Sequence, residues 1–481
     1  MDEALRALAE DIRAAMPSSI ELPAGAGKTQ LVAALAAAAA ERTERPLVLT
    51  HTNAGVEALR RRLRSFGVAS GAVRVATIAS WSFDLVRHYP QLSGLMVAPE
   101  PDWRQSDAYY HGATAAVRAE WIRKVLQASY ACVIVDEYQD CTIEQHDLML
   151  GLAEAVPVCV FGDPLQNVFN FGGNTTVRWH SHVTTTWPAY KVAIKAWRWE
   201  GHNELLGQWL IDIRADLSAG QPIDLTGAPV VWAQTSSADP SAAAVSVCLT
   251  QAQQAGSIVA IDKWPTTCAT VASRTNGAYG MMEELEGKFM MDFAAVIDAG
   301  DPAHIAPGTL KFAKECISKI AGLLNPVVAT KLAKGQSVSH LRRPGAEQAL
   351  TLLSGLLTDA APARVLETLE TIAELPGGRI YRREAWRDTL KALKVVSAGG
   401  DVTLRQALTH VRNRARVVGR AAEPRVVSRP LLIKGLEYDH AIVLNADRLS
   451  ATELYVALSR GRKSLTIVSN SRVLRPGPPS L

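Results

Sequence analysis

The chain has 481 residues, of which 48% are hydrophobic and 20% charged, so two to four domains with buried cores are expected and a disordered chain is excluded. No apolar run approaches the roughly 20 residues that a membrane-spanning helix needs, which argues against a membrane protein. The formal net charge is +4, but residues 300–430 carry 21 Lys and Arg against 11 Asp and Glu, which fits either a solvated helical surface or a face for a polyanion or an acidic partner.

The N-terminal residues 1–16 are acidic and helical in pattern, unlike a secretory signal or a transit peptide. The chain has six cysteines and none of them forms a CxxC pair, so neither a disulfide framework nor a zinc ribbon is expected. Cys132 and Cys159 lie in apolar, strand-like runs and are predicted to be buried. Together these features predict a cytoplasmic protein.

The first stretch that carries chemistry is IELPAGAGKTQLVAALAAA, residues 20–38. This stretch predicts the end of a strand, a glycine-containing turn and a helix. The N–H groups of such a turn and the N-terminus of the helix can bind a phosphate. Lys28 supplies a charge for the β- and γ-phosphates, Thr29 a hydroxyl for Mg²⁺, and Leu22 stands where the strict P-loop pattern has glycine. The predicted nucleotide-binding residues of this loop are Ala24, Gly25, Ala26, Gly27, Lys28, Thr29 and Gln30.

The second stretch is VIVDEYQDCTIEQHDLML, residues 133–150, in which an apolar run is followed at once by acids. Buried strands do not end in carboxylates without a reason, and a metal site at the carboxyl edge of a parallel sheet provides one. Asp136 is the expected Mg²⁺ carboxylate, with Thr29, and Glu137 the expected base that orients the attacking water. The two stretches predict a nucleoside triphosphatase that uses ATP and Mg²⁺.

The motif DEYQD after a strand, together with PAGAGKT, resembles the superfamily 1 DNA helicases of the UvrD/Rep type. Further stretches resemble the family's later motifs in the family's order. These are residues 48–63, 75–83 and 160–171, AWRWE around Arg198, and residues 433–444 and 454–468.

The fold class that this resemblance implies is α/β, with two RecA-like parallel-sheet lobes of the P-loop NTPase type and a helical insertion in the second lobe. The first lobe is expected over residues 1–189, with a short insertion over about 87–124. The second lobe is expected over residues 190–299 and 431–481, and the basic helical insertion over 300–430. Alternation of apolar strands with helices before about Tyr190 agrees with a parallel sheet.

The resemblance also implies roles for single residues. Arg198 and Arg460, expected from the second lobe, would reach the γ-phosphate, Gln166 would sense it, and Glu437 would hydrogen-bond the ribose. The residues implied to contact single-stranded DNA are His51, Thr52, Asn53, Thr77, Trp81, Phe169 and Phe171. For the three aromatic residues among them, packing in the core is the alternative to stacking on bases.

The chain departs from the family pattern at four points. No glutamine-bearing adenine motif precedes the P-loop, and the helix after WRWE lacks the usual serine. RPLLIKG replaces Thr-x-His-x-x-Lys-Gly, so Arg429, Leu431 and Leu432 stand in place of polar DNA contacts, and Gly172 stands where the family often has arginine. The residues for ATP hydrolysis are therefore nearly complete, whereas those that grip DNA are altered.

Two functions follow from these observations. The first is an ATP-dependent 3′-to-5′ DNA translocase or helicase in DNA repair or anti-phage defence, acting on single-stranded DNA and duplex junctions. The second is a nucleic-acid-sensing NTPase subunit that regulates a partner without unwinding. A separate nuclease subunit is a further expected partner, by analogy with the compact helicases of Gabija-type anti-phage systems. In the insertion, Arg412, Arg414, Arg416 and Arg420 are the clearest candidates for a basic binding face, with a plain solvated surface as the alternative.

Overall fold

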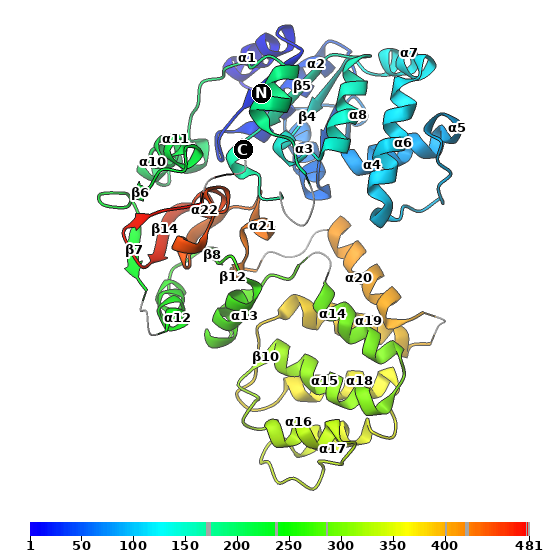
Figure 1. The fold of residues 1–481 in the computed structure, drawn as a ribbon, viewed down its shortest axis with the longest axis vertical. Coiled ribbons are helices and arrows are strands. Elements are labelled where there is room, and N and C mark those ends of the chain that lie inside the picture. The colour runs from blue at the N-terminus through cyan, green and yellow to red at the C-terminus, as the bar shows by residue number, and fades with distance from the viewer. Residues whose placement is uncertain are drawn as a thin grey trace. The chain divides into compact units, whose positions relative to one another are not determined.

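The computed structural model describes residues 1–169, 175–235, 239–284, 287–399, 402–418, 423–477 and 479. By its contacts the chain divides into two compact units. Unit 1 comprises residues 1–229, 449–463 and 473–481, and unit 2 comprises residues 230–448 and 464–472. Each unit contains one parallel sheet with its helices, which confirms the predicted α/β fold with two parallel sheets (Figure 1).

The sheet of unit 1 has five strands in the order β1-β5-β4-β2-β3, and all of its pairings are parallel. The strands are β1 (Ser18–Glu21), β2 (Pro46–Thr50), β3 (Arg74–Thr77), β4 (Cys132–Val135) and β5 (Val158–Gly162). The three central strands are buried along their whole length, as expected for apolar runs covered on both faces. Because the strands are parallel, the loops after β1, β4 and β5 leave the sheet at the same edge.

The helices of unit 1 pack around this sheet. Every residue of α2 from Leu31 to Ala39 is buried, because α2 lies between α1 and α3 and is apolar all round. The helices are α1 (Glu3–Ala14), α2 (Lys28–Glu41), α3 (Asn53–Ser65), α4 (Ile78–His88), α5 (Pro90–Ser93), α6 (Ser106–Arg118), α7 (Glu120–Ser129), α8 (Ile143–Ala153), α9 (Thr184–Thr186), α10 (Glu204–Asp212), α11 (Arg214–Ser218) and α22 (Ala451–Leu458).

Short helical turns and one small ladder complete unit 1. The turns are η1 (Trp103–Gln105), η2 (Tyr138–Asp140), η3 (Pro164–Gln166), η4 (Trp179–Val183) and η5 (Trp197–Trp199). The ladder pairs β6 (Ile223–Asp224) with β15 (Val473–Leu474) in antiparallel fashion. Two of the turns, η2 and η3, follow β4 and β5 directly and so lie at the carboxyl edge of the sheet.

Unit 2 contains the second sheet, six strands in the order β7-β14-β13-β8-β12-β9. The pairs β8–β12, β8–β13, β12–β9 and β14–β7 are parallel. The strands are β7 (Val231–Gln234), β8 (Ile258–Ile261), β9 (Gly280–Met281), β12 (Arg425–Ser428), β13 (Tyr438–Val443) and β14 (Gly461–Ser469). The helices that accompany them are α12 (Pro240–Gln251), α13 (Pro265–Arg274), α21 (Pro430–Ile433) and the turn η6 (Ala446–Arg448).

Between β9 and β12 the chain forms a helical segment with its own core. Phe312 is at the centre of this core, with its ring stacked 4.4 Å from that of Phe293 and 5.9 Å from that of Trp386. The elements are α14 (Lys288–Asp298), α15 (Pro302–Cys316), β10 (Ile317–Ser318), α16 (Pro326–Ala333), α17 (Glu347–Gly355), α18 (Pro362–Ala373), β11 (Arg379–Ile380), α19 (Arg383–Ser397) and α20 (Leu404–Val418).

The structure corrects one expectation for this basic segment. Arg412 does not contribute to an exposed positive face, because it is buried, donates to the Glu284 carbonyl at 2.5 Å and lies 3.7 Å from the Asp388 carboxylate. Arg414 is exposed. The side chain of Arg416, and Arg420, lie outside the residues that the structure describes.

Two simpler predictions concern cysteines and membranes. All six cysteines are free and buried, as predicted for Cys132 and Cys159. Burial raises the pKa of both of these thiols to about 12, so they are inert apolar side chains. In the part of the chain that the structure describes, no helix combines the length and the apolar character needed to cross a bilayer.

Candidate nucleotide-binding site

The P-loop connects β1 to the first residue of α2, as predicted from the sequence. Gly25 and Gly27 have φ values of 72° and 84°, a left-handed conformation that residues with a Cβ rarely adopt. A Cβ on Gly25 would also lie 2.5 Å from the ring of Trp199, and one on Gly27 would lie 3.2 Å from the ring of Trp197. The turn η5 therefore lies directly against the P-loop. At Gly25 both the positive φ and the Trp199 ring exclude a side chain, whereas at Gly27 the positive φ is the main reason. Leu22, which replaces the usual glycine, is buried in the core.

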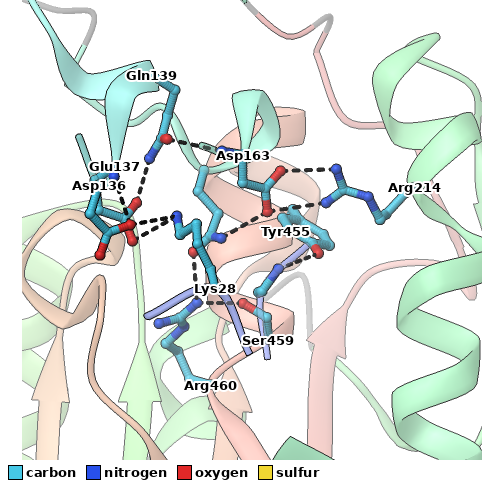
Figure 2. Close-up of polar contacts among 11 residues, drawn as sticks. Lys28, Asp136, Glu137, Gln139, Asp163, Arg214, Tyr455, Ser459 and Arg460 are labelled. Carbon is cyan, nitrogen blue, oxygen red and sulfur yellow. Dashed lines mark hydrogen bonds and ion pairs between the residues drawn. The ribbon is translucent and has the colours of Figure 1, made fainter. Parts of the chain in front are cut away.

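Lys28 and the two acids that follow β4 meet at the carboxyl edge of the sheet. The Lys28 ammonium is 2.8 Å from the Glu137 carboxylate and 4.0 Å from that of Asp136 (Figure 2). Burial alone would lower the pKa of Lys28, but the charges of Glu137 and Asp136 outweigh it and the pKa is raised. Lys28 therefore stays charged, as its predicted role in phosphate binding requires.

The backbone at Glu137 is strained. Its φ of 57° places a residue with a Cβ in the left-handed region, and its N–H donates to the Asp136 carboxylate at 2.9 Å. Strain of this kind costs on the order of 1–3 kcal/mol and is retained where the surrounding structure fixes a side chain for a purpose. Here it turns the carboxylates of two successive residues toward the same lysine.

Gln139 connects the Glu137 carboxylate to the next strand end. It is buried in η2, donates to Glu137 at 2.6 Å and accepts the Asp163 N–H at 2.9 Å (Figure 2). These two bonds fix the amide and through it the Glu137 carboxylate. Gln139 belongs to the DEYQD motif but was not among the predicted site residues.

Gln166 and Arg460, both expected to act on the nucleotide, are hydrogen-bonded to one another. An Arg460 nitrogen donates to the Gln166 amide oxygen at 3.3 Å, while the Gln166 amide nitrogen donates to Asp163 at 2.8 Å. Arg460 is fully buried, and it also donates to the Ser459 hydroxyl at 2.6 Å and to the Val456 carbonyl at 2.7 Å. By its contacts Arg460 belongs to unit 1.

Two further residues that the sequence analysis missed join this network, Arg214 and Tyr455. The Arg214 guanidinium contacts the Asp163 carboxylate at 2.9 and 3.1 Å, and its centre lies 5.0 Å from the centre of the Tyr455 ring. The Tyr455 hydroxyl accepts the Ala24 N–H of the P-loop at 3.2 Å (Figure 2). Tyr455 lies within residues 454–468, which resemble a family motif, but that resemblance implies no role for it, and Arg214 lies in none of the resembling stretches.

Arg198 lies in the turn that covers the P-loop. Its N–H donates to the Gly25 carbonyl at 3.1 Å, and its guanidinium donates to the Ser459 carbonyl at 2.6 Å. Trp199 beside it is buried, whereas Trp197 is 54% exposed with the Lys195 ammonium 3.8 Å from the centre of its ring. The structure places Trp197 and Trp199 against the glycines of the P-loop.

The remaining predicted nucleotide and metal residues are placed as follows. Ala26 is buried in the loop, and Thr29 and Gln30 are half-buried in the first turn of α2. Glu437 belongs to unit 2, where it is exposed just before β13. The Thr29 hydroxyl and the Asp136 carboxylate are hard oxygen donors, and the strand end and P-loop bring Asp136 to within 4.0 Å of Lys28. This donor set fits Mg²⁺, which is usually held by one or two protein oxygens together with phosphates.

The residues expected to contact DNA lie at the carboxyl edge of the unit 1 sheet. Thr52 accepts the Gly55 N–H at 3.0 Å and caps α3, which begins at Asn53. Thr77 ends β3 and caps α4 with Ser80. Asn53 and Thr77 line a polar cleft of about 670 Å³, which Arg60, Arg64, Arg74 and Asp84 also line.

Three other DNA-binding predictions have different outcomes. Trp81 is 3% exposed and belongs to the core of unit 1, so the structure favours the packing alternative over base stacking. His51 is half-buried, with its Nε2 3.6 Å from the Cys141 sulfur, and Phe169 is half-buried. Phe171 lies outside the residues that the structure describes.

Comparisons with known proteins bear on the first part of the chain. A family model described as an AAA domain matches residues 6–172, which include the P-loop and the acids after β4. No curated protein matches the chain. Among solved structures, the crystal structure of Pif1 helicase from Candida albicans is 10% identical to the chain with a TM-score of 0.28. The match covers 53% of this chain and 56% of the Pif1 chain.

Proposed function

We propose that the protein is an ATP-dependent, Mg²⁺-requiring enzyme that moves along single-stranded DNA in the 3′-to-5′ direction, as a translocase or helicase. The observation that carries this proposal is the cluster of Lys28, Asp136 and Glu137 at the carboxyl edge of a parallel sheet, joined through Gln139 and Asp163 to Gln166 and Arg460. A phosphate loop and two carboxylates support hydrolysis of a nucleoside triphosphate. Hydrogen bonds through Gln139 and Asp163 connect this cluster to the turn η3, which follows β5.

In this proposal each side chain has a separate role in hydrolysis. The N–H groups of the P-loop and the Lys28 ammonium bind the phosphates, and Mg²⁺ held by Thr29 and Asp136 would neutralise charge on the phosphate oxygens. Glu137 leaves Lys28, orients a water molecule and accepts its proton. Arg460, buried and fixed by three hydrogen bonds, supplies positive charge for the transferred phosphoryl group, and Arg198 is the second arginine in this role.

The polar cleft lined by Asn53, Thr77, Arg60 and Arg74 supports the DNA part of the proposal. Arginine side chains and helix N-termini are the usual ligands of backbone phosphates. The cleft runs along β3, the edge strand of the sheet, from Arg74 at its start to Thr77 at its end. Bound phosphates would make the affinity fall steeply with salt.

A second function, a nucleic-acid-sensing NTPase that regulates a partner nuclease without unwinding, has its own support in unit 2. Arg429 stands where the resembling family has a polar DNA contact. Here its guanidinium pairs with the Glu284 carboxylate and donates to the Lys263 carbonyl at 3.2 Å. Arg429 thus makes contacts within unit 2 in place of the family's polar DNA contact, which supports sensing over processive unwinding.

Two assays on the purified chain separate these functions. ATP hydrolysis is measured with and without single-stranded homopolymers, with Lys28→Ala as the inactive control. Strand displacement is measured on a duplex with a 3′ single-stranded tail and on one with a 5′ tail. Displacement of the 3′-tailed substrate alone supports the helicase; stimulated hydrolysis without displacement of either substrate supports the sensor.

A further inference from the structure

Arg214 has a buried guanidinium that contacts acids from two neighbouring strand ends. Its side chain is 12% exposed, although α11, which it begins, is a short helix with no recognisable motif. The guanidinium contacts the Asp163 carboxylate at 2.9 and 3.1 Å and the Glu21 carboxylate at 2.8 Å. Glu21 ends β1 just before the P-loop, and Asp163 follows β5. One cation therefore binds the ends of two paired strands on which the nucleotide site is built.

The contact with Asp163 has the geometry of a strong interaction. Two guanidinium nitrogens approach the two carboxylate oxygens, which is the bidentate arrangement that arginine forms and lysine does not. Asp163 is fully buried, so its charge depends on partners within the protein. Burial alone would lower the pKa of Arg214, but Asp163 and Tyr455 outweigh it and the pKa is raised, so the guanidinium stays charged.

From Asp163 the contact continues to the residue expected to sense the γ-phosphate. The same carboxylate oxygen that contacts Arg214 accepts a hydrogen bond from the Gln166 amide nitrogen at 2.8 Å. This bond turns the Gln166 amide oxygen toward Arg460, which donates to it at 3.3 Å. The orientation of the Gln166 amide therefore depends on a carboxylate that Arg214 holds in place.

A second contact leads from Arg214 to the P-loop. The guanidinium lies over the ring of Tyr455, whose hydroxyl accepts the Ala24 N–H at 3.2 Å. Tyr455 is buried, and burial raises the pKa of its hydroxyl to about 12, so it stays neutral. The contact through Tyr455 acts on the backbone of the loop proposed to bind the nucleotide. The contact through Asp163 acts on the Gln166 side chain instead.

We infer that Arg214 is a positioning residue for nucleotide hydrolysis, which fixes Asp163 and through it the Gln166 amide beside Arg460. The inference rests on the proposed function, because it assigns the residue to the hydrolysis proposed above. Arg214 itself touches neither Lys28 nor Glu137 in the described contacts, so it acts through other side chains. Its loss leaves Asp163 buried without its guanidinium and leaves Gln166 without a fixed acceptor.

The first experiment compares steady-state ATP hydrolysis by the full chain and its Arg214→Ala, Arg214→Lys and Arg6→Ala variants. Arg6 is the matched control, since it forms an exposed ion pair with Glu41 in the same unit. We expect kcat to fall by about 100-fold in Arg214→Ala, as for a misplaced catalytic group, with a much smaller change in KM. Arg214→Lys should recover little, because a single ammonium cannot make the bidentate contact. Arg6→Ala should match the wild type.

Two further measurements distinguish positioning from loss of structure. Guanidinium ion, added well below concentrations that unfold proteins, should restore part of kcat to Arg214→Ala and none to Lys28→Ala. Gln166→Ala should lower kcat strongly in the wild type but little further in the Arg214→Ala background, since residues that act as a unit are not additive.

Wild-type hydrolysis with an unchanged kcat in Arg214→Ala, or with additive effects of Arg214→Ala and Gln166→Ala, overturns the inference and leaves the proposed function standing. A wild type that hydrolyses no nucleotide overturns both. If Arg214→Ala does not fold, the lysine variant and its response to guanidinium decide: near-wild-type kcat in a folded Arg214→Lys overturns the inference.

Discussion

The Lys28 ammonium of the P-loop lies 2.8 Å from the carboxylate of Glu137, the residue expected to orient the attacking water. The two groups neutralise one another in a buried setting, where the attraction between opposite charges is stronger than in water. A phosphate bound by the loop therefore competes with Glu137 for Lys28. In the proposed function, binding of the nucleotide would therefore also release the Glu137 carboxylate to orient the water molecule.

Replacement of Glu137 by glutamine separates binding from turnover. The neutral amide no longer attracts Lys28, so ATP binding should be retained or tightened, while kcat falls by about 100-fold or more because the base is lost. Equilibrium binding of a fluorescent ATP analogue and steady-state hydrolysis measure the two effects. Lys28→Ala should lose both ATP binding and hydrolysis. Near-wild-type hydrolysis by Glu137→Gln would assign the water-orienting role to another residue.

Gln139→Met should lower kcat by about tenfold or more while the chain stays folded. Methionine fills a similar volume but cannot donate to Glu137 or accept from the Asp163 N–H, so the base loses its fixed position. The control is Gln208→Met, because Gln208 is exposed and bonds only Asp212 among the described contacts. Equal kcat values for the two variants would show that Glu137 needs no such support.

Gly25→Ala should abolish nucleotide binding, because the added Cβ meets the Trp199 ring at 2.5 Å in addition to the strain of a positive φ. Gly67→Ala is the matched control. Gly67 has a φ of 78° but nothing within 4 Å of the added Cβ. Gly67→Ala should therefore lower the free energy of unfolding by about 1–2 kcal/mol without loss of ATP binding. Isothermal titration with ATP and thermal denaturation test both variants. Unchanged binding by Gly25→Ala would refute the close contact between η5 and the loop.

Trp81→Ala should destabilise the protein by about 3–5 kcal/mol, the usual cost of removing a large aromatic side chain from a core. Trp121, which is 73% exposed on α7, provides the control, and Trp121→Ala should change the free energy of unfolding by less than about 0.5 kcal/mol. Urea denaturation measures both. A Trp81→Ala variant that kept wild-type stability but lost DNA-stimulated hydrolysis would restore the base-stacking role.

Stability should depend on pH through Glu283 in unit 2. Burial raises the pKa of Glu283 to about 7, and the Arg382 guanidinium 3.5 Å away offsets this only in part. The folded chain then keeps the proton over a range in which the unfolded chain, with a pKa of about 4.3, has released it. The free energy of unfolding should therefore fall by up to about 3 kcal/mol as the pH rises from about 4 to about 7.

The matched variant for this pH dependence is Glu283→Gln, which cannot ionise. Denaturation of the wild type and the variant at a series of pH values gives the difference in stability between them. That difference should change between pH 4 and 7 and stay constant above. A difference that does not vary with pH would show that Glu283 ionises normally in the folded protein.

The sequence predicted those parts of the site whose residues are consecutive in the chain. The P-loop glycines, Lys28, and the acids after β4 each lie next to the strand or helix that positions them, so local pattern was enough. The two parallel sheets were implied by the family resemblance, and the alternation of apolar strands with helices before about Tyr190 agreed with the first of them. The exact boundaries of the two lobes stay predictions.

The residues that sequence reasoning missed are connected across long stretches of chain. Tyr455 accepts from Ala24, which is 431 positions away, and Trp199, in the stretch AWRWE, packs on Gly25. Arg214 carries no local sign of its two acidic partners. For Arg412 the prediction was wrong. Four arginines close together in the sequence suggested an exposed basic face, but Arg412 is buried and lies 3.7 Å from the Asp388 carboxylate. Spacing shows which residues share a helix face but not which face is covered.

The most direct test of the proposed function is ATP hydrolysis by the purified full chain, with and without single-stranded DNA, beside Lys28→Ala. We predict Mg²⁺-dependent hydrolysis that single-stranded DNA of any sequence stimulates and that added salt reduces, with no activity in Lys28→Ala. A wild-type rate equal to that of Lys28→Ala, with DNA present and at low salt, would contradict the account.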